Sequence, residues 1–395
     1  MQGKSKLVLT VTATSMCRRT LPRLELDRGL AWIDAFRRHA KPRSFTRSAG
    51  LHRAAVPATY LRRIDGAAPT ALAARYSFPP ALASPSSGSS TSIDLSAVLA
   101  VFDEVSSWSF FDADRTHRPG VSVHLSAVAH WSTSPAATSN GGAKNGTPVR
   151  PPEVGEPLDV VVSAPQCGRN LGFVSVELRR GNSVLAAGKH VKSLPMPGLG
   201  PGKRIPWDFV FAPMLGDLPI QLLHKLEQQV DTSKVGEMDD SASKWFAGLR
   251  GMPTNEAMQP LHNVDENRAI YEAALVTSEA QLNGVGTTHG GFQAMLAEAG
   301  VRWAREQRAN ASTTSAVNSR TLRALSVNYL SAHRRGPLHV QATLPSLAQA
   351  SSQLNLGASN GTAVEGLGTF GETAEVVLYD PRNARRTSEA TLHYF

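Results

Sequence analysis

The stretch GTTHGGFQAMLAEAG, residues 286–300, places a histidine and two glycines directly before a run with helical spacing. The first N–H groups of a helix have no partner inside the helix, and the helix dipole favours negative charge there. Gly290 and Gly291 carry no side chain that would keep another group away from those N–H groups. The motif alone is equally consistent with a tightly turned helix start and with a site that binds the oxyanion of a reacting ester or thioester.

A carboxylate, Glu298, follows His289 by nine residues in the same run. Nine residues at about 100° each amount to two and a half turns, so Glu298 points away from the face that carries His289. It also lies about 13 Å further along the helix axis. A single helix therefore cannot easily bring its own glycine N–H and its own carboxylate to one carbonyl group. If both are catalytic, each needs a complement from another helix.

A second helix of this kind is expected, because the order strand, helix and four strands occurs twice. The first copy has the entry strand LAARYSF, the helix SIDLSAVLAVFDEVSSWSFF and the strands GVSVHLSAVAHW, LDVVVSAP, LGFVSVELRRG and SVLAAGKHVKSL. The second has RAIYEAALV, the helix beginning at HGGFQ, and the strands ALSVNYLSA, LHVQATL, TAEVVLYD and ATLHYF. Alternating apolar and polar residues are typical of antiparallel strands with one buried face. The sequence predicts an α+β fold in which a sheet wraps a central helix.

The segment NGVGTTHGG, with Asn283 six residues before His289 and an acid nine after it, resembles the hotdog-fold acyl-CoA thioesterases of the phenylacetate-pathway type. The resemblance implies a tandem (double) hotdog, in which each antiparallel sheet wraps a long central helix and the two units form an intrachain pseudo-dimer. In that family two units pack sheet to sheet. Each site takes the Asn and His-Gly from one unit and the acid from the other. The acid acts as general base or nucleophile, a glycine N–H polarises the carbonyl, and a Ser or Thr orients the water or the acid.

The two copies predict unequal sites when they are compared position by position. Asp103 is the acid of the first copy, followed one turn later by Ser107, with Ser122 on the next strand. We expect these three residues to face Asn283, His289 and Gly290 of the second copy. The neighbouring Glu104 is an alternative to Asp103, which matches the register better. Gly291, and Arg169 in the turn CGRN, are further candidates for contacts with the substrate.

The second composite site is predicted to have decayed. Asp94 stands nine residues before Asp103, where the second copy has His289, and the first copy has no HGG motif. An acid at a helix N-terminus is a good cap but repels an oxyanion. Glu298 would therefore face Asp94 and Ser96 without the usual oxyanion donor. We expect one competent site and one decayed site in each chain.

The predicted activity is hydrolysis of an acyl-CoA thioester, with coenzyme A as part of the substrate and with no metal or nucleotide cofactor. The alternative from another class is a non-catalytic structural subunit of a large mitochondrial complex. A degenerate first copy, long Ser/Gly/Pro insertions and a basic arm suit that role. An acyl-CoA hydratase would keep the fold, but such enzymes usually pair Asp and His in one motif on one unit, and that motif is not found. The loops 132–157 and 345–368 would distinguish enzyme from scaffold if they plugged the groove.

Charge and composition argue against several other classes of protein. Residues 1–48 hold eleven lysines and arginines against three acids, a net +8 of the chain's +9. The body is thus nearly neutral, which argues against a nucleic-acid partner. No run has the roughly 18 apolar residues of a membrane span, so an integral membrane protein is not expected. Two cysteines, Cys17 and Cys167, predict no disulfide framework.

The predicted domain organisation has four parts. Residues 1–50 form a basic, acid-poor arm that is typical of a mitochondrial or plastid transit peptide, and they predict the mitochondrial matrix as location. The alternatives are a disordered basic tail and a retained arm that docks on a partner. Residues 65–195 form the first unit and residues 263–395 the second. Residues 196–262 join them as a Pro/Gly linker followed by a connector with one helix around 218–229. We expect an acyl-CoA substrate as partner, and either a homo-oligomer of pseudo-dimers or membership of a larger mitochondrial assembly.

Overall fold

The computed structural model describes residues 45, 72–83, 91–113, 120–131, 149–163, 165–168, 170–194, 259–261, 269–278, 281–283, 286–311, 321–345 and 372–394. The predicted basic arm, apart from Phe45, and the predicted helix at 218–229 lie outside these residues. So do most of the two loops named above as tests of an open groove. Within the described part, no helix is both long enough and apolar enough to span a membrane.

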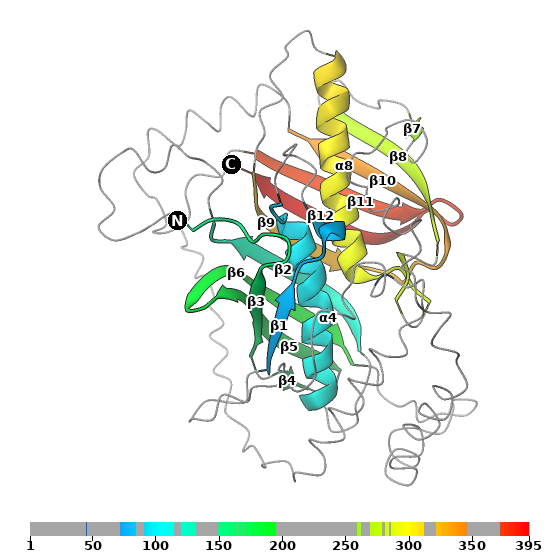
Figure 1. Ribbon diagram of the computed structural model, residues 1–395. Helices are drawn as coiled ribbons and strands as arrows, with labels where there is room; N and C mark the ends of the chain where they lie inside the picture. Colours follow the sequence, from blue (N-terminus) through cyan, green and yellow to red (C-terminus); the bar gives the residue numbers. More distant parts are fainter. Residues whose placement is uncertain are drawn as a thin grey trace, which may run out of the picture.

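The element order repeats, as predicted. The first unit consists of β1 (Leu72–Ser77), a short 3-10 helix (Pro80–Leu82), α4 (Leu95–Ala113), β2 (Val121–Ala129), β3 (Pro157–Val162), β4 (Gln166–Cys167), β5 (Leu171–Arg180) and β6 (Ser183–Ser193). The second consists of β7 (Gln259–Leu261), β8 (Ala269–Thr277), α8 (Gly290–Ala311), β9 (Leu322–Tyr329), β10 (Gly336–Leu344), β11 (Glu372–Asp380) and β12 (Arg385–Tyr394). Each unit thus has one long helix between its entry strand and its remaining strands (Figure 1).

The strands of both units form one continuous antiparallel sheet. Its order is β1-β3-β5-β6-β2-β9-β12-β11-β10-β8-β7 within a 12-stranded sheet, with β4 added beside β5. The units meet edge to edge where β2 pairs with β9, and Ser126 lies opposite Ser326 at the centre of that pairing. The resemblance implied units packed sheet to sheet. The join in the structure is instead a strand pairing, which satisfies the backbone groups of two strands that would otherwise be exposed edges.

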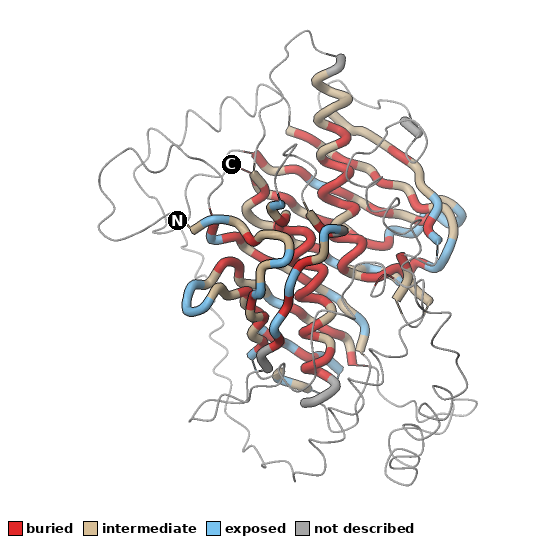
Figure 2. Tube along the Cα trace, viewed as in Figure 1, coloured by how far each residue is buried: buried red, intermediate tan, exposed pale blue. Residues whose placement is uncertain are grey.

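Both helices lie on the same side of this sheet and touch each other (Figures 1 and 2). Residues 97–102 of α4 are buried without interruption, because the sheet encloses this helix on one side and α8 covers it on another. A helix that is apolar all round is expected in such a position. The start of α8 lies against the middle of α4: a Cβ atom added to Gly291 would stand only 2.6 Å from the Ala100 Cα. This close approach is the physical reason for glycine at that position.

Candidate active site

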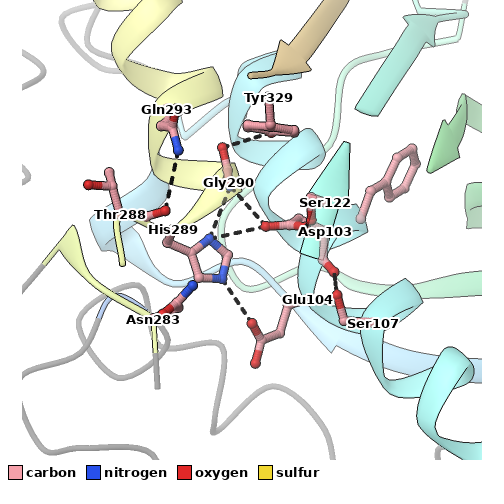
Figure 3. Close-up of polar contacts among 12 residues, drawn as sticks. Asp103, Glu104, Ser107, Ser122, Asn283, Thr288, His289, Gly290, Gln293 and Tyr329 are labelled. Atoms are coloured by element: carbon pink, nitrogen blue, oxygen red, sulfur yellow. Dashed lines mark hydrogen bonds and ion pairs between the residues drawn. The ribbon is translucent and has the colours of Figure 1, made fainter. Parts of the chain in front are cut away.

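The site is built around the carboxylate of Asp103 on α4, which is buried at 4% exposure. Its Oδ1 accepts a hydrogen bond from the Ser122 hydroxyl at 2.9 Å. Its Oδ2 accepts one from the Gly291 N–H at 3.0 Å, at the start of α8. Two residues of the first unit and one of the second therefore meet on a single carboxyl group (Figure 3).

Basic groups surround this carboxylate. The His289 Nδ1 lies 3.3 Å from Oδ2, and the His190 Nε2 lies 3.5 Å from Oδ1. Burial alone would raise the pKa of Asp103, but the charges of His289 and Lys192, together with the hydrogen bond from Ser122, hold it below its ordinary value. Asp103 is therefore ionised at neutral pH, as a general base or nucleophile must be.

The helix start supplies the N–H through Gly291, one residue after the glycine that the sequence favoured. Gly290 has another part: its carbonyl oxygen accepts a hydrogen bond from the Tyr329 hydroxyl at 2.9 Å. A Cβ atom at Gly290 would stand 2.8 Å from the Asp103 Oδ2, so the missing side chain makes room for the carboxylate. Both glycines are thus needed for close approach, one by a carboxyl group and the other by a neighbouring helix.

His289 is held between two acids of α4. Its Nε2 lies 3.0 Å from the Glu104 Oε2, while Nδ1 faces Asp103 (Figure 3). The Phe45 ring stacks against the imidazole with 4.5 Å between centroids. Burial would lower the pKa of His289, but Asp103 and Glu104 raise it above its ordinary value. The Gly291 N–H also lies 3.0 Å from Nδ1, and a proton on that nitrogen directs the N–H to Asp103 instead.

A buried histidine that the sequence reasoning missed completes the other side of the carboxylate. His190 on β6 is fully buried; its Nε2 lies 2.9 Å from the Ser122 Oγ and its Nδ1 lies 2.5 Å from the Ser106 Oγ. Burial lowers the pKa of His190 to about 3, so the ring is neutral. Because Ser122 donates to Asp103, the tautomer that satisfies the chain carries its proton on Nε2 and donates to Ser122. Ser122 is thereby fixed toward the carboxylate.

Lys192 is the second missed residue, two positions further along β6. Its ammonium group donates to the Ser107 Oγ at 2.8 Å, and the residue is 4% exposed. Burial lowers the pKa of Lys192, and the nearby charges of Asp103 and Glu104 oppose that shift. A signal for both residues was present: the inward positions of β6 include Ala186, His190 and Lys192, so polar groups stand where alternation predicts apolar ones.

Two predicted residues hydrogen-bond to the main chain or to their own turn. The Ser107 hydroxyl donates to the main-chain oxygen of Asp103 at 2.5 Å, as serine often does one turn back in a helix. Asn283 shapes the turn before His289, because its amide donates to the Thr287 hydroxyl at 2.8 Å and its oxygen accepts the Thr287 N–H at 3.1 Å. Arg169 lies outside the described residues.

Glu298 lies in a separate group of polar residues, at the place on α8 that is equivalent to the place of Asp103 on α4. Arg302 lies 3.5 Å from Glu298 and 3.5 Å from Asp94, and Ser96 hydrogen-bonds to Glu298. We call these four residues the Glu298 cluster. Burial, reinforced by Asp94, raises the pKa of Glu298 to about 7, although Arg302 opposes the shift. The predicted neighbours of Glu298 are therefore together, with an arginine among them.

Strand register shows what the Glu298 cluster lacks. Ser122 pairs with Lys192 across β2 and β6, and Leu322 pairs with Tyr394 at the matching place across β9 and β12. Leu125 pairs with His190, and Leu325 pairs with Leu392. The counterparts of the serine, lysine and histidine around Asp103 are thus, in order, Leu322, Tyr394 and Leu392.

Within the described residues, no group of three or more His, Cys, Asp or Glu side chains is arranged to hold a metal ion.

No protein-family model matches the sequence, and no curated protein matches it. Solved structures of hotdog-fold thioesterases are similar to the chain. A 12:0-ACP thioesterase from Umbellularia californica has a TM-score of 0.41 and 11% identity, covering 82% of this chain and 97% of that one. A hot dog fold protein of unknown function from Alicyclobacillus acidocaldarius has a TM-score of 0.40 and 8% identity, covering 82% and 92%. Zebrafish thioesterase superfamily member 2 has 19% identity and a TM-score of 0.24 over 33% of this chain and 78% of its own.

Proposed function

We propose that this protein hydrolyses an acyl-CoA thioester at a composite site between its two units. The observation that carries the proposal is the contact between the Asp103 carboxylate of α4 and the Gly291 N–H that begins α8, at 3.0 Å. An ionised carboxylate and a helix-start N–H are the two groups that acyl transfer needs, one to deliver or act as the nucleophile and the other to receive the oxyanion, and here they lie within hydrogen-bond distance of each other.

In the proposed reaction the thioester carbonyl oxygen replaces the Asp103 Oδ2 as the acceptor of the Gly291 N–H, and the helix dipole strengthens this hydrogen bond. Asp103 then accepts a proton from a water molecule whose oxygen bonds to the carbonyl carbon. Alternatively, an Asp103 oxygen bonds to that carbon and forms an anhydride, which water later cleaves. In both routes the carbon–sulfur bond breaks, coenzyme A leaves as its thiol or thiolate, and a carboxylic acid is released.

The residues around Asp103 have supporting parts in either route. Ser122, fixed by the neutral His190 ring, holds Oδ1 and orients the carboxylate or the attacking water. His289, whose protonated form is favoured by Asp103 and Glu104, lies beside Oδ2 and next to the N–H that receives the carbonyl oxygen. Removal of a single oxyanion donor of this kind lowers kcat by about 10²–10³-fold.

We further infer that the units are two hotdog units fused in one chain, with a single competent site. The site at Asp103 has the glycine N–H, the serine and both histidines. At the corresponding places the Glu298 cluster and its neighbours have Ser96, Leu322, Asp94 and Leu392. An acid in the place of His289 opposes binding of an oxyanion, and Arg302 is shared between the two carboxylates at 3.5 Å from each. The Glu298 cluster therefore serves as an ion-paired contact between the units.

The test is hydrolysis of a panel of short-, medium- and long-chain acyl-CoAs by the intact protein and by Asp103→Ala. We expect turnover of at least one chain length and a loss of at least about 10³-fold in the variant, as for removal of a catalytic base or nucleophile. No turnover on any member of the panel would favour a non-catalytic structural subunit. Turnover that is equal in both proteins would remove Asp103 from the mechanism.

A further inference from the structure

Glu104 follows Asp103 on α4, and these consecutive residues hold both ring nitrogens of one histidine from the other unit. The Glu104 Oε2 lies 3.0 Å from the His289 Nε2, and the Asp103 Oδ2 lies 3.3 Å from Nδ1. Figure 3 shows the imidazole between the two carboxyl groups, with each nitrogen directed at one of them. A neutral imidazole has a single N–H, so only the doubly protonated ring donates to both acids.

The charges that face His289 come from three elements. Asp103 and Glu104 of α4 favour the imidazolium, while Lys192 of β6 disfavours it. His190, also of β6, is neutral, and the Tyr329 hydroxyl of β9 is engaged with the Gly290 carbonyl. Two carboxylates therefore offset one ammonium group and one imidazolium. This balance fits a buried site, where an unpaired charge would be strongly unfavourable.

We propose that Glu104 is a positioning residue that keeps His289 as an imidazolium between the two carboxylates. His289 in this form holds Asp103 in place and puts positive charge beside the Gly291 N–H, where the oxyanion develops. This inference rests on the proposed hydrolysis and adds a pH limit to it. Activity falls when His289 loses its proton, because the ring then donates to one carboxylate only and no longer carries charge.

The variant Glu104→Gln separates charge from shape. The Glu104 side chain is 16% exposed, so an amide of the same size fits, and its oxygen accepts the same hydrogen bond from Nε2–H. The basic limb of the pH–rate profile should move to lower pH by about one unit, as expected for loss of an adjacent opposite charge. Above that limb the variant would then be about tenfold slower than the intact protein. The acid limb should stay, because His289, Lys192 and Ser122, which hold the Asp103 pKa down, are unchanged.

Two further variants are matched controls. Glu104→Asp keeps the charge and should return the basic limb at least half of the way to its original pH. Glu375→Gln removes one acid from an exposed position on β11 and should move neither limb. A loss of activity in Glu104→Gln that is the same at every pH would indicate a structural role and would overturn the proposal.

A readout without turnover keeps this inference separate from the proposed function. The ring signals of His289, assigned by their absence in His289→Gln, can be titrated by NMR in the intact protein and in Glu104→Gln. We expect the titration midpoint to fall by about one pH unit in Glu104→Gln. An unchanged midpoint contradicts the inference even if thioesters are hydrolysed. A lowered midpoint in a protein that hydrolyses no acyl-CoA would support the effect of Glu104 on the protonation of His289 and would contradict the proposed hydrolysis.

Discussion

Glu298→Gln is expected to stabilise the protein at alkaline pH. Burial raises the pKa of Glu298 from 4.5 to about 7 in the folded chain, and its side chain is 8% exposed. Below pH 4.5 the carboxyl group is protonated in both states and carries no penalty. Between pH 4.5 and 7 the unfolded chain releases this proton while the folded chain keeps it, so the contribution of Glu298 to stability falls as the pH rises. Above pH 7 the loss is complete.

The size of the effect follows from that shift. At about 1.4 kcal/mol for each pH unit, the penalty at pH 8 is on the order of 3 kcal/mol. Glutamine has the same size and carries no charge, so it escapes this penalty, which already includes the opposing attraction to Arg302. Arg302 keeps Asp94 as a partner at 3.5 Å. We therefore expect a net gain of roughly 1–3 kcal/mol at pH 8 and almost no gain at pH 4.

The assay is urea unfolding of the intact protein and of Glu298→Gln at pH 4 and pH 8. Glu375→Gln, at an exposed position, is the control, and its difference in stability from the parent should be the same at pH 4 and at pH 8. A Glu298→Gln protein that is less stable than the parent at pH 8 would refute the reasoning. It would mean that attraction between Glu298 and Arg302 outweighs the burial of the carboxylate.

Two other substitutions test the geometry around Asp103. Gly291→Ala places a Cβ 2.6 Å from the Ala100 Cα, so unfolding experiments should show a loss of about 1–3 kcal/mol, and the displaced N–H should lower kcat by roughly 10²–10³. A variant with unchanged kcat would mean that the oxyanion is bound elsewhere. Lys192→Met removes one of the positive charges that lower the Asp103 pKa, so the acid limb of the pH–rate profile should move to higher pH by up to about one unit. An acid limb that stays in place would show that His289 and Ser122 are sufficient to keep Asp103 ionised.

Several parts of the fold were readable because they depend on local patterns. Helical spacing after His289 and strand alternation on either side predicted the repeated element order, which the structure confirms. The geometry of one helix excluded a partnership between Gly290 and Glu298 and required a second helix. The edge-to-edge join of β2 and β9 was not readable, because strand order depends on pairings between distant segments.

At the site, the helix and strand periodicity of the sequence predicted which elements meet. It predicted the individual contacts between their side chains less reliably. The structure brings Asp103 and Ser122 to the start of α8, as expected, but the facing N–H belongs to Gly291. Ser107 was expected to orient the carboxylate because it lies one turn after it; a hydroxyl one turn along a helix can instead bond to the main chain, and here it does. His190 and Lys192 were not predicted, because strand alternation assigns polar residues to the exposed face, whereas these two residues of β6 point inward.

The most direct test of the composite site compares kcat/KM for Asp103→Asn and Glu298→Gln on the acyl-CoA that the intact protein hydrolyses fastest. The two acids occupy equivalent places on α4 and α8, and each variant replaces a carboxylate by an amide of the same size. We predict a loss of at least about 10³-fold for Asp103→Asn and of less than about threefold for Glu298→Gln. Equal losses, or a larger loss in Glu298→Gln, would contradict the assignment of a single competent site at Asp103.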